Sequence, residues 1–255
     1  MQNKLIFLGT GTSQGIPMIG CSCPVCKSTD PHDKRLRCSI YLEYEGLQLV
    51  VDAGPDFRQQ ILRENITNLD AVLLTHQHKD HTGGLDDIRA FNYLYDKNFP
   101  IYAEERVQAS LKQEYAYAFA ACPYPGIPQF ELHTIDESPF QIQGRTIIPI
   151  RAWHHRLPIL GFRFGKLAYL TDANRIEPEA IEKIKGVEIF IINTIRHTPH
   201  LSHFSLPQAL EVIRQVGARE NYLTHLSHQI DAHQALKALL PTNVQPAYDG
   251  LCIQF

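Results

Sequence analysis

Short apolar runs alternate with amphipathic segments along most of the chain. The apolar runs predict strands at 5–8, 38–44, 47–52, 70–75, 146–153, 160–164, 167–171, 187–192, 220–224 and 251–255. Apolar positions spaced three and four residues apart predict helices at 56–64, 85–95, 104–114, 177–185, 205–216 and 231–239. The Pro- and Tyr-rich stretch 115–130 interrupts this alternation. We expect it to form an irregular loop or lid, or a plain surface insertion.

The order of these elements predicts an α/β protein. Glu45-Gly46 joins two early strands as a hairpin, which favours antiparallel pairing, whereas the later strand–helix alternation favours sheets covered by helices. Two mixed β-sheets packed face to face and flanked by helices, an αββα sandwich, satisfy both signals. No linker, low-complexity stretch or charge block divides the sequence, so residues 1–255 are expected to form a single domain.

Composition narrows the functional classes. The net charge of −3 gives no long-range attraction for nucleic acid, so a nucleic-acid partner is not expected. The first apolar run is too short for a signal peptide or a membrane span. Three of the six cysteines lie between Cys21 and Cys26, a clustering more typical of metal binding than of disulfides. We therefore expect a cytoplasmic protein without a membrane partner. The thirteen histidines are the compositional outlier, and histidine is the commonest metal ligand.

Three predicted strands end in the same short motif, Leu-Thr followed by His or Asp. The three copies, called Leu-Thr phrases, are Leu74-Thr75-His76, Leu170-Thr171-Asp172 and Leu223-Thr224-His225. Because chemistry in layered α/β folds gathers where strands run out into loops, we expect the three last residues to converge. The alternative is that threonine merely suits the last position of a strand.

The segment after the first phrase concentrates metal-binding side chains. It reads His76-Gln77-His78-Lys79-Asp80-His81, and Gly83-Gly84 follows it closely. Four such side chains in six residues can point one way only in a tight loop, and the glycines supply the backbone freedom for it. Imidazole and carboxylate together suit Zn²⁺, Mn²⁺ or Fe²⁺ better than Ca²⁺ or Mg²⁺. The segment therefore predicts a transition-metal site.

This segment resembles the signature of the metallo-β-lactamase superfamily. Val51-Asp52-Ala53-Gly54, Asp172, His225 and the closing Asp249-Gly250 occur in the order found in that family. Within it the chain is most similar to the PhnP-type phosphodiesterases, through the opening 9–17, the pattern Cys21-x-Cys23-x-x-Cys26, and the segment 224–229. The resemblance implies a metallo-β-lactamase fold and an active site that holds two divalent metals, Mn²⁺ or Zn²⁺.

The resemblance also implies which residues bind the metals. The first metal would take His76, His78 and His154, the second would take Asp80, His81 and His225, and Asp172 would bridge both. His155, adjacent to His154, is the alternative third histidine for the first metal. Asp52 would hold an imidazole in orientation, or else serve only as a turn residue at the end of a strand.

The cysteine cluster predicts a separate structural zinc. Cys21, Cys23 and Cys26 supply three thiolates, one ligand short of a closed tetrahedral shell. By resemblance His228 is the fourth ligand, with Cys38 and His32 as alternatives, and three free thiols are the remaining interpretation. Cys122 and Cys252 are interpreted as small buried hydrophobic residues, and His133 and His233 as surface residues.

These expectations combine into a metal-dependent hydrolase. We expect a phosphodiesterase that acts on a small phosphodiester, cyclic or linear, by attack of a hydroxide bridging the metals. Asp80 and His203 are the expected catalytic residues. By resemblance His203, just before helix 205–216, faces the substrate phosphate and acts as general acid; the alternative is a capping or surface role. Arg196, His197 and His200 are candidate phosphate contacts, and a second copy of the chain is the expected protein partner.

Three other functions remain as alternatives. A thioesterase of the same fold is disfavoured by the cysteine cluster and by His203. A tRNA 3′-processing nuclease is disfavoured by the slightly acidic charge balance. A non-catalytic accessory protein, like a relative in pyrroloquinoline quinone biosynthesis, is disfavoured because the complete ligand set is present.

Overall fold

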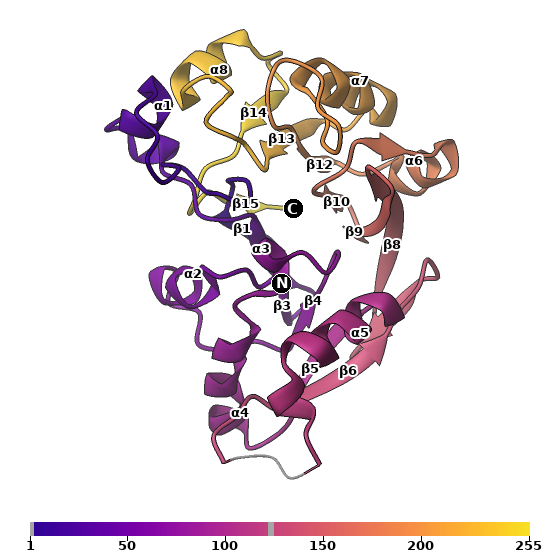
Figure 1. The fold of residues 1–255 in the computed structure, drawn as a ribbon. Coiled ribbons are helices and arrows are strands. Elements are labelled where there is room, and N and C mark those ends of the chain that lie inside the picture. The colour runs from indigo at the N-terminus through magenta and orange to yellow at the C-terminus, as the bar shows by residue number, and fades with distance from the viewer. Residues whose placement is uncertain (1–2, 122–124) are drawn as a thin grey trace.

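Two mixed β-sheets lie face to face, with helices on their outer faces (Figure 1). The computed structural model describes residues 3–121 and 125–255. Over these residues the first sheet has seven strands in the order β15-β1-β2-β3-β4-β5-β6. In chain order they are β1 (Lys4–Gly9), β2 (Ser39–Tyr44), β3 (Leu47–Val51), β4 (Ala71–Leu73), β5 (Phe99–Ala103), β6 (Phe130–Thr134) and β15 (Cys252–Gln254).

The second sheet has eight strands within the same described ranges. Its order is β11-β8-β9-β10-β12-β13-β14, and β7 pairs with β8 off this path. The strands are β7 (Phe140–Ile142), β8 (Arg145–His154), β9 (Leu157–Phe164), β10 (Leu167–Leu170), β11 (Arg175–Ile176), β12 (Ile189–Asn193), β13 (Glu220–Thr224) and β14 (Val244–Pro246).

Each sheet carries its own layer of helices. Helices α2 (Phe57–Arg63), α4 (Arg89–Tyr95) and α5 (Glu105–Glu114) bury apolar side chains against the first sheet. Helices α6 (Pro178–Ile184), α7 (Leu206–Val216) and α8 (His233–Leu239) do the same on the second sheet. The remaining helical segments are short: α1 (Pro24–Lys27), α3 (Lys79–Thr82) and the 3₁₀ turns Pro31–Asp33, Leu85–Ile88 and Ala116–Phe119. Among the described residues, no helix has the length and apolar character needed to cross a membrane.

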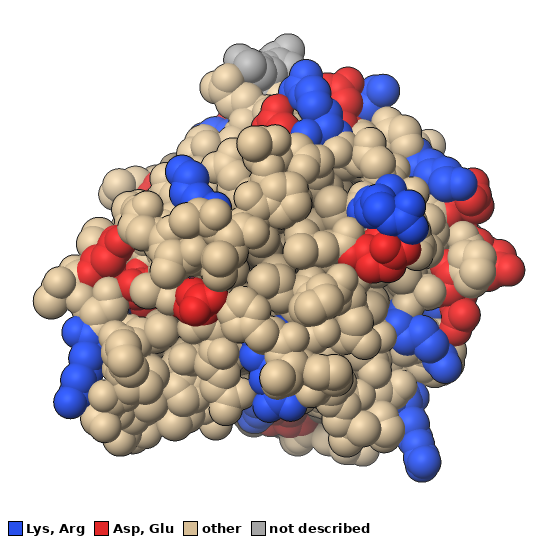
Figure 2. Space-filling view, turned by 90° about the horizontal axis from the view of Figure 1, so that it is seen from above, with Lys and Arg blue, Asp and Glu red and all other residues tan. Residues whose placement is uncertain are grey.

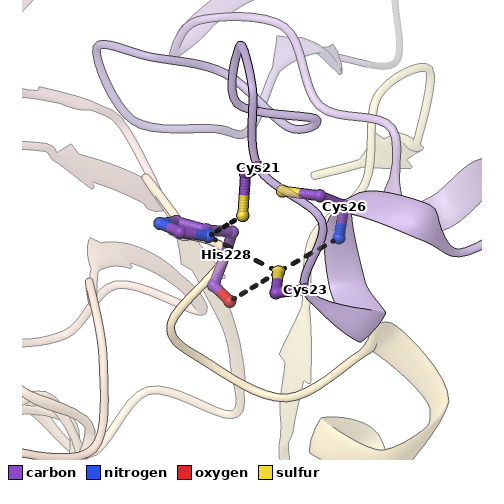
Figure 3. Close-up of side chains that lie close together, drawn as sticks. All are labelled: Cys21, Cys23, Cys26 and His228. Atoms are coloured by element: carbon purple, nitrogen blue, oxygen red, sulfur yellow. Dashed lines mark hydrogen bonds between the residues drawn. The ribbon is translucent and has the colours of Figure 1, made fainter.

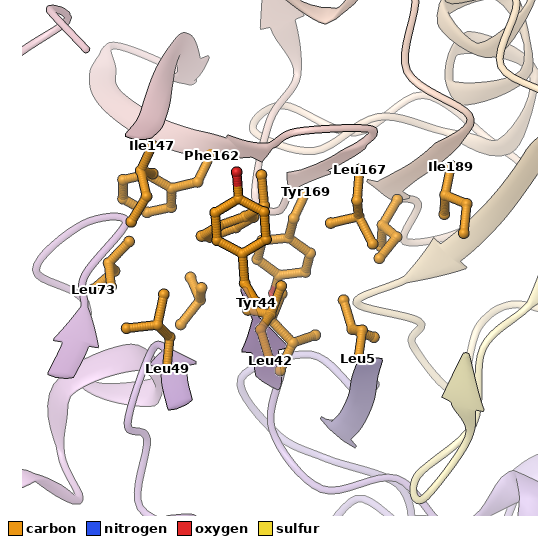
Figure 4. Packing of buried hydrophobic residues seen from close by; sticks show 14 of the residues in the cluster. Leu5, Leu42, Tyr44, Leu49, Leu73, Ile147, Phe162, Leu167, Tyr169 and Ile189 are labelled. Atoms are coloured by element: carbon orange, nitrogen blue, oxygen red, sulfur yellow. The ribbon is translucent and has the colours of Figure 1, made fainter. Parts of the chain in front are cut away.

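The main core lies between the sheets. Leu42, Leu49 and Leu73 of the first sheet face Phe162 and Tyr169 of the second, and all five are fully buried (Figure 4). Alternate residues along each strand point into this layer, because side chains of a strand alternate between its two faces. Burial of such side chains stabilises the fold by about 1.5–3 kcal/mol each. The interface between the sheets therefore fixes how their edges are placed relative to each other.

The expected αββα architecture is confirmed, although several boundaries differ. The strands at Phe99–Ala103, Phe130–Thr134, Phe140–Ile142 and Val244–Pro246 were not predicted. Two of them contain a proline, and two are only three residues long, so their sequence signal is weak. The expected helix 85–95 is instead a 3₁₀ turn followed by α4. The expected loop 115–130 contains the turn Ala116–Phe119, and Cys122 lies outside the described residues.

Strand direction places the predicted strand ends at common edges. Strands β10, β12 and β13 are parallel neighbours, so the residues after β10 and β13 leave the second sheet on the same side. Strands β3 and β4 are likewise parallel in the first sheet, which places Asp52 and the segment after β4 together. These two edges come together at one site.

Candidate metal centre

The three repeated strand ends meet around the carboxylate of Asp172. His81, from the loop after β4, places Nε2 3.1 Å from Asp172 Oδ2. His225, directly after β13, places Nε2 3.1 Å from Asp172 Oδ1. Asp80 joins the same group, with Oδ2 3.3 Å from His81 Nε2. The ligand atoms of Asp80, His81, Asp172 and His225 all lie within 4.8 Å of one another. Side chains from both sheets therefore share one small volume.

A second group of imidazoles adjoins this one. The ring centroids of His76 and His78 are 4.6 Å apart, and those of His78 and His154 are 5.1 Å apart. His154 Nδ1 lies 2.8 Å from the backbone oxygen of Asp172, a contact that fixes the orientation of the ring. His155 is exposed, and its backbone N–H donates to Asn174. The structure thus places His154, and not His155, with the other imidazoles.

The donor atoms of the site fit divalent cations. Among the described residues, His76 Nε2, His81 Nε2 and both ring nitrogens of His225 are buried and lack a hydrogen-bond partner. Nε2 of His81 and Nε2 of His225 each lie 3.1 Å from an oxygen of Asp172, but their geometry is not that of a hydrogen bond. Leaving such groups unpaired costs about 1–3 kcal/mol each, unless a cation takes their lone pairs. Imidazoles and carboxylates in this arrangement suit Zn²⁺, Mn²⁺ or Fe²⁺.

A strained backbone conformation at three residues turns their side chains towards the site. Asp52, Asp172 and His225 follow the ends of three strands and have φ angles of 65°, 61° and 57°. Non-glycine residues rarely occupy this left-handed region, which costs about 1 kcal/mol or more per residue. The surrounding packing must offset that cost. Strain of this kind gathers at functional sites, and here it turns each side chain into the site.

The loop that carries Asp80 and His81 packs tightly on the segment after β3. Ala53 N–H donates to the oxygen of His81, and Gly84 N–H donates to the oxygen of Ala53. A Cβ added to Gly54 would lie 2.0 Å from the backbone oxygen of Asp80. Only glycine permits this approach, so Gly54 sets the position of the loop.

The charges around His81 and Asp172 stabilise each other. Burial opposes a charge on His81, but Asp172, Asp52 and Asp80 outweigh it and raise the pKa of this imidazole well above its ordinary value. Burial also opposes ionisation of Asp172. The neighbouring His225 and His81 outweigh that effect and hold the pKa of Asp172 well below its ordinary value. Burial lowers the pKa of His76 well below 6.5. Asp172 is thus charged, and His76 is neutral.

His203 is a buried neighbour of the same group. Its ring centroid is 4.6 Å from that of His154 and 4.7 Å from that of His225. Its Nδ1 is 3.7 Å from Asp172 Oδ1. Burial, followed by the electrostatic effect of the neighbouring His225, lowers the pKa of His203 to about 2. The surrounding protein groups therefore keep this imidazole neutral.

The neighbouring basic residues are engaged elsewhere. The guanidinium of Arg196 donates to the oxygens of Thr198 and Pro199 and to Gln229 Oε1. His197 Nε2 is 2.6 Å from Asp231 Oδ2. Both contacts hold the loop before α7 against the segment that follows β13. The third candidate phosphate contact, His200, lies beside His203, with ring centroids 5.1 Å apart.

The cysteine cluster forms a separate group with His228 (Figure 3). His228 Nδ1 is 3.2 Å from Cys21 Sγ and 3.5 Å from Cys23 Sγ. Cys26 joins them, and the four ligand atoms lie within 4.8 Å of one another. The backbone N–H of Cys26, with a further contribution from His228, lowers the pKa of Cys23 to about 6, a value that favours the thiolate. This group has the composition of a structural zinc site.

Several residues outside these groups differ from expectation. Cys38 is buried against Tyr169 and Thr224, and His32 is held by Asp30, so neither alternative ligand is in the cysteine group. The expectation that Cys252 is buried is wrong, because it lies exposed on edge strand β15. His233 was predicted to be a surface residue, but it is buried at 5% exposure and its ring stacks on His32.

Comparison with known proteins identifies the family. Residues 48–226 match the family described as "Beta-lactamase superfamily domain". The chain belongs to the metallo-β-lactamase superfamily. A solved structure titled as a new diphosphatase from the PhnP family is 38% identical, with a TM-score of 0.93, and the match covers 100% of this chain and 98% of that one. The expected PhnP-like resemblance is confirmed.

Two further relatives broaden this picture of the superfamily. A protein named octanoyltransferase from Porphyromonas gingivalis is 43% identical over 251 residues, which are 97% of this chain and 51% of that protein. The chain thus spans about half the length of this relative. The Zn²⁺-bound PqqB of Methylobacterium extorquens shares the fold at a TM-score of 0.78, with 18% identity and coverage of 99% and 100%. These matches together support a metallo-β-lactamase fold for the chain.

Gly54→Ala tests whether the close backbone approach positions the metal loop. We expect it to lower the free energy of unfolding by about 3 kcal/mol, because the new methyl group meets backbone and not a flexible side chain. Gly144→Ala is the control: Gly144 lies in the turn between β7 and β8, with φ 81° and no atom within 4 Å of its missing Cβ, and should lose only about 1 kcal/mol. Chemical denaturation measures both values, and equal losses would contradict the role given to Gly54.

Proposed function

We propose that this protein is a metal-dependent phosphodiesterase that hydrolyses a small phosphodiester. The observation that carries the proposal is that the carboxylate of Asp172 is grouped both with Asp80, His81 and His225 and with His154, whose ring lies beside those of His76 and His78. The similarity to a structure titled as a PhnP-family diphosphatase supports it. A diphosphate bridge and a phosphodiester are both cleaved by attack at phosphorus, so a diphosphate diester belongs to the same substrate class.

We assign the metal ligands in two sets. His76, His78 and His154 form the first set, Asp80, His81 and His225 form the second, and Asp172 is shared. Bound at such a pair, divalent cations would supply neutralisation of phosphate charge and activation of a water nucleophile at neutral pH. Mn²⁺ and Zn²⁺ are the proposed metals. The chain's own residues then have to orient the phosphate and provide a proton.

We assign the proton donor role to His203. A leaving alkoxide needs a proton, and a positioned imidazole can provide one. His203 is buried and neutral in the free site, so it binds the anion first as an N–H donor. The negative charge of a bound phosphate raises the pKa of a neighbouring imidazole, and this favours uptake of the proton that His203 later gives to the leaving oxygen.

The alternatives are less consistent with this site. The relative named octanoyltransferase is about twice as long as this chain, and the present site offers imidazoles and carboxylates arranged for cations. Figure 2 shows basic and acidic side chains interspersed on the face seen from above, around a largely uncharged centre. A nuclease that grips a long polyanion would be expected to gather positive charge. A small diester requires no such surface.

We further propose that Cys21, Cys23, Cys26 and His228 bind one structural zinc. His228 lies three residues after His225, so a cation there would tie the N-terminal loop to the segment that carries a ligand of the active site. Backbone contacts run along the same path, since Thr12 N–H donates to the oxygen of Leu226. A cytoplasmic location and a homodimer remain predictions.

The adjacent histidines His154, the last residue of β8, and His155, in the turn that follows, provide a matched test of the phosphodiesterase. With bis-(p-nitrophenyl) phosphate and Mn²⁺, His154→Ala should lower kcat/KM by more than the roughly 10- to 100-fold typical of losing a group that only orients a ligand. His155→Ala should stay within about twofold of wild type, because this side chain is exposed and outside the site. Comparable rates for wild type and His154→Ala would refute the assignment.

The cysteine group has its own test. Cys23→Ala should remove one zinc per chain and lower the midpoint of thermal unfolding, because a structural zinc contributes folding free energy. Cys252→Ala is the control, since this thiol is exposed and outside the group. Elemental analysis and calorimetry of the same preparations measure both effects. An unchanged zinc content in Cys23→Ala would eliminate the structural site.

A further inference from the structure

Asp52 is the buried centre of a hydrogen-bond network beneath the metal centre. Its Oδ1 lies 2.9 Å from the backbone nitrogen of Thr75. Its Oδ2 lies 2.8 Å from the hydroxyl of Thr75 and 2.7 Å from His81 Nδ1. Asp52, Thr75 and His81 are all 0% exposed. Water therefore cannot take over any of these contacts, and the three side chains must satisfy one another.

The hydroxyl of Thr75 makes a second contact that links this network to another imidazole. Its Oγ1 is 2.9 Å from His76 Nδ1 as well as 2.8 Å from Asp52 Oδ2. A hydroxyl has one hydrogen to donate and lone pairs to accept. Because a carboxylate only accepts, the hydroxyl donates to Asp52 and is left to accept from His76 Nδ1–H.

The direction of these hydrogen bonds determines which nitrogen of each ring faces the site. His81 donates from Nδ1 to Asp52 directly, and His76 donates from Nδ1 to Thr75. The proton of a neutral imidazole on Nδ1 leaves Nε2 with its lone pair. In both residues Nε2 is buried and has no hydrogen-bond partner among the described residues. In each ring the Nδ1 proton is thus used within the protein, so Nε2 is the nitrogen that faces the proposed cation.

We propose that Thr75 is a positioning residue whose hydroxyl relays the carboxylate of Asp52 to His76, so that one buried aspartate orients an imidazole in each of the two ligand sets. The inference rests on the proposed function in taking His76 and His81 as metal ligands. It predicts an asymmetry: loss of the Thr75 hydroxyl affects the set that contains His76, whereas loss of the Asp52 charge affects both.

The other two threonines of the repeated strand ends make different contacts. Thr171 donates to Asp172 Oδ2 at 2.8 Å, and the hydroxyl of Thr224 lies 3.3 Å from Cys38 Sγ. Of the three, Thr75 joins a carboxylate to the imidazole of the next residue. Thr224 therefore offers a matched control, because it is equally buried, precedes a proposed ligand and stands in the same Leu-Thr-His phrase.

The experiment compares Thr75→Val, Thr75→Ser and Thr224→Val with wild type. Equilibrium dialysis against Mn²⁺, with elemental analysis, measures the affinity of the protein for its active-site cations. This readout does not depend on turnover. We expect Thr75→Val to lower the affinity for one of the two active-site cations by about 10- to 100-fold, the range typical of losing a group that orients a ligand. The affinity for the other cation should not change. Thr75→Ser, which keeps the hydroxyl, and Thr224→Val should bind both as wild type does.

Two results would overturn the relay. One is unchanged affinity for both cations in Thr75→Val, and the other is an equal loss for both, which would mean that the substitution disturbs the whole site. If Thr75→Val does not fold, Asp52→Asn decides. The proposal requires this substitution to lower the affinity for both cations, and a loss of affinity for one alone contradicts it. A wild type that holds no pair of cations would instead refute the proposed function.

Discussion

The carboxylate of Asp172 is the point on which the two halves of the molecule depend. One of its oxygens faces His81 from the loop after β4 of the first sheet, and the other faces His225 at the end of β13 of the second. Neither sheet alone could bring these side chains together. The apolar layer between the sheets therefore has a chemical consequence, because it sets the separation and the register of the edges from which the ligands project.

The local geometry of the site is unfavourable by itself and is held by its surroundings. Three residues at strand ends adopt left-handed backbone, several imidazole nitrogens are buried without a partner among the described residues, and the glycines of the metal loop allow backbone to approach closely. The left-handed backbone and the unpaired nitrogens each cost free energy in the cation-free chain. The large buried core offsets that cost. Cations bound by the unpaired nitrogens would recover part of the free energy that these features cost. Metal binding would therefore be coupled to folding.

The sequence predicts those parts of the site that are short-range and repeated. The HxHxDH segment at His76–His81 and the three Leu-Thr phrases can be recognised without a structure, and parallel pairing of β10, β12 and β13 explains why two of those phrases meet. The role of Thr75 could not be predicted, because threonine at a strand end is common for reasons of β propensity alone. Its signal lies in a contact with Asp52, 23 residues away in the sequence. The burial of His233 and the exposure of Cys252 likewise depend on which edge or helix each residue occupies.

The two assigned ligand sets require that Asp172 lie between two cations. Anomalous diffraction above the zinc edge, from crystals of the wild-type protein prepared with Zn²⁺, would locate them. We expect two peaks about 3.5–4 Å apart on either side of the Asp172 carboxylate. One peak flanked by His76, His78 and His154 and another flanked by Asp80, His81 and His225 would match the assigned ligands. A single peak at this site, or peaks that leave Asp172 without a cation on one side, would show that the two ligand sets do not share Asp172.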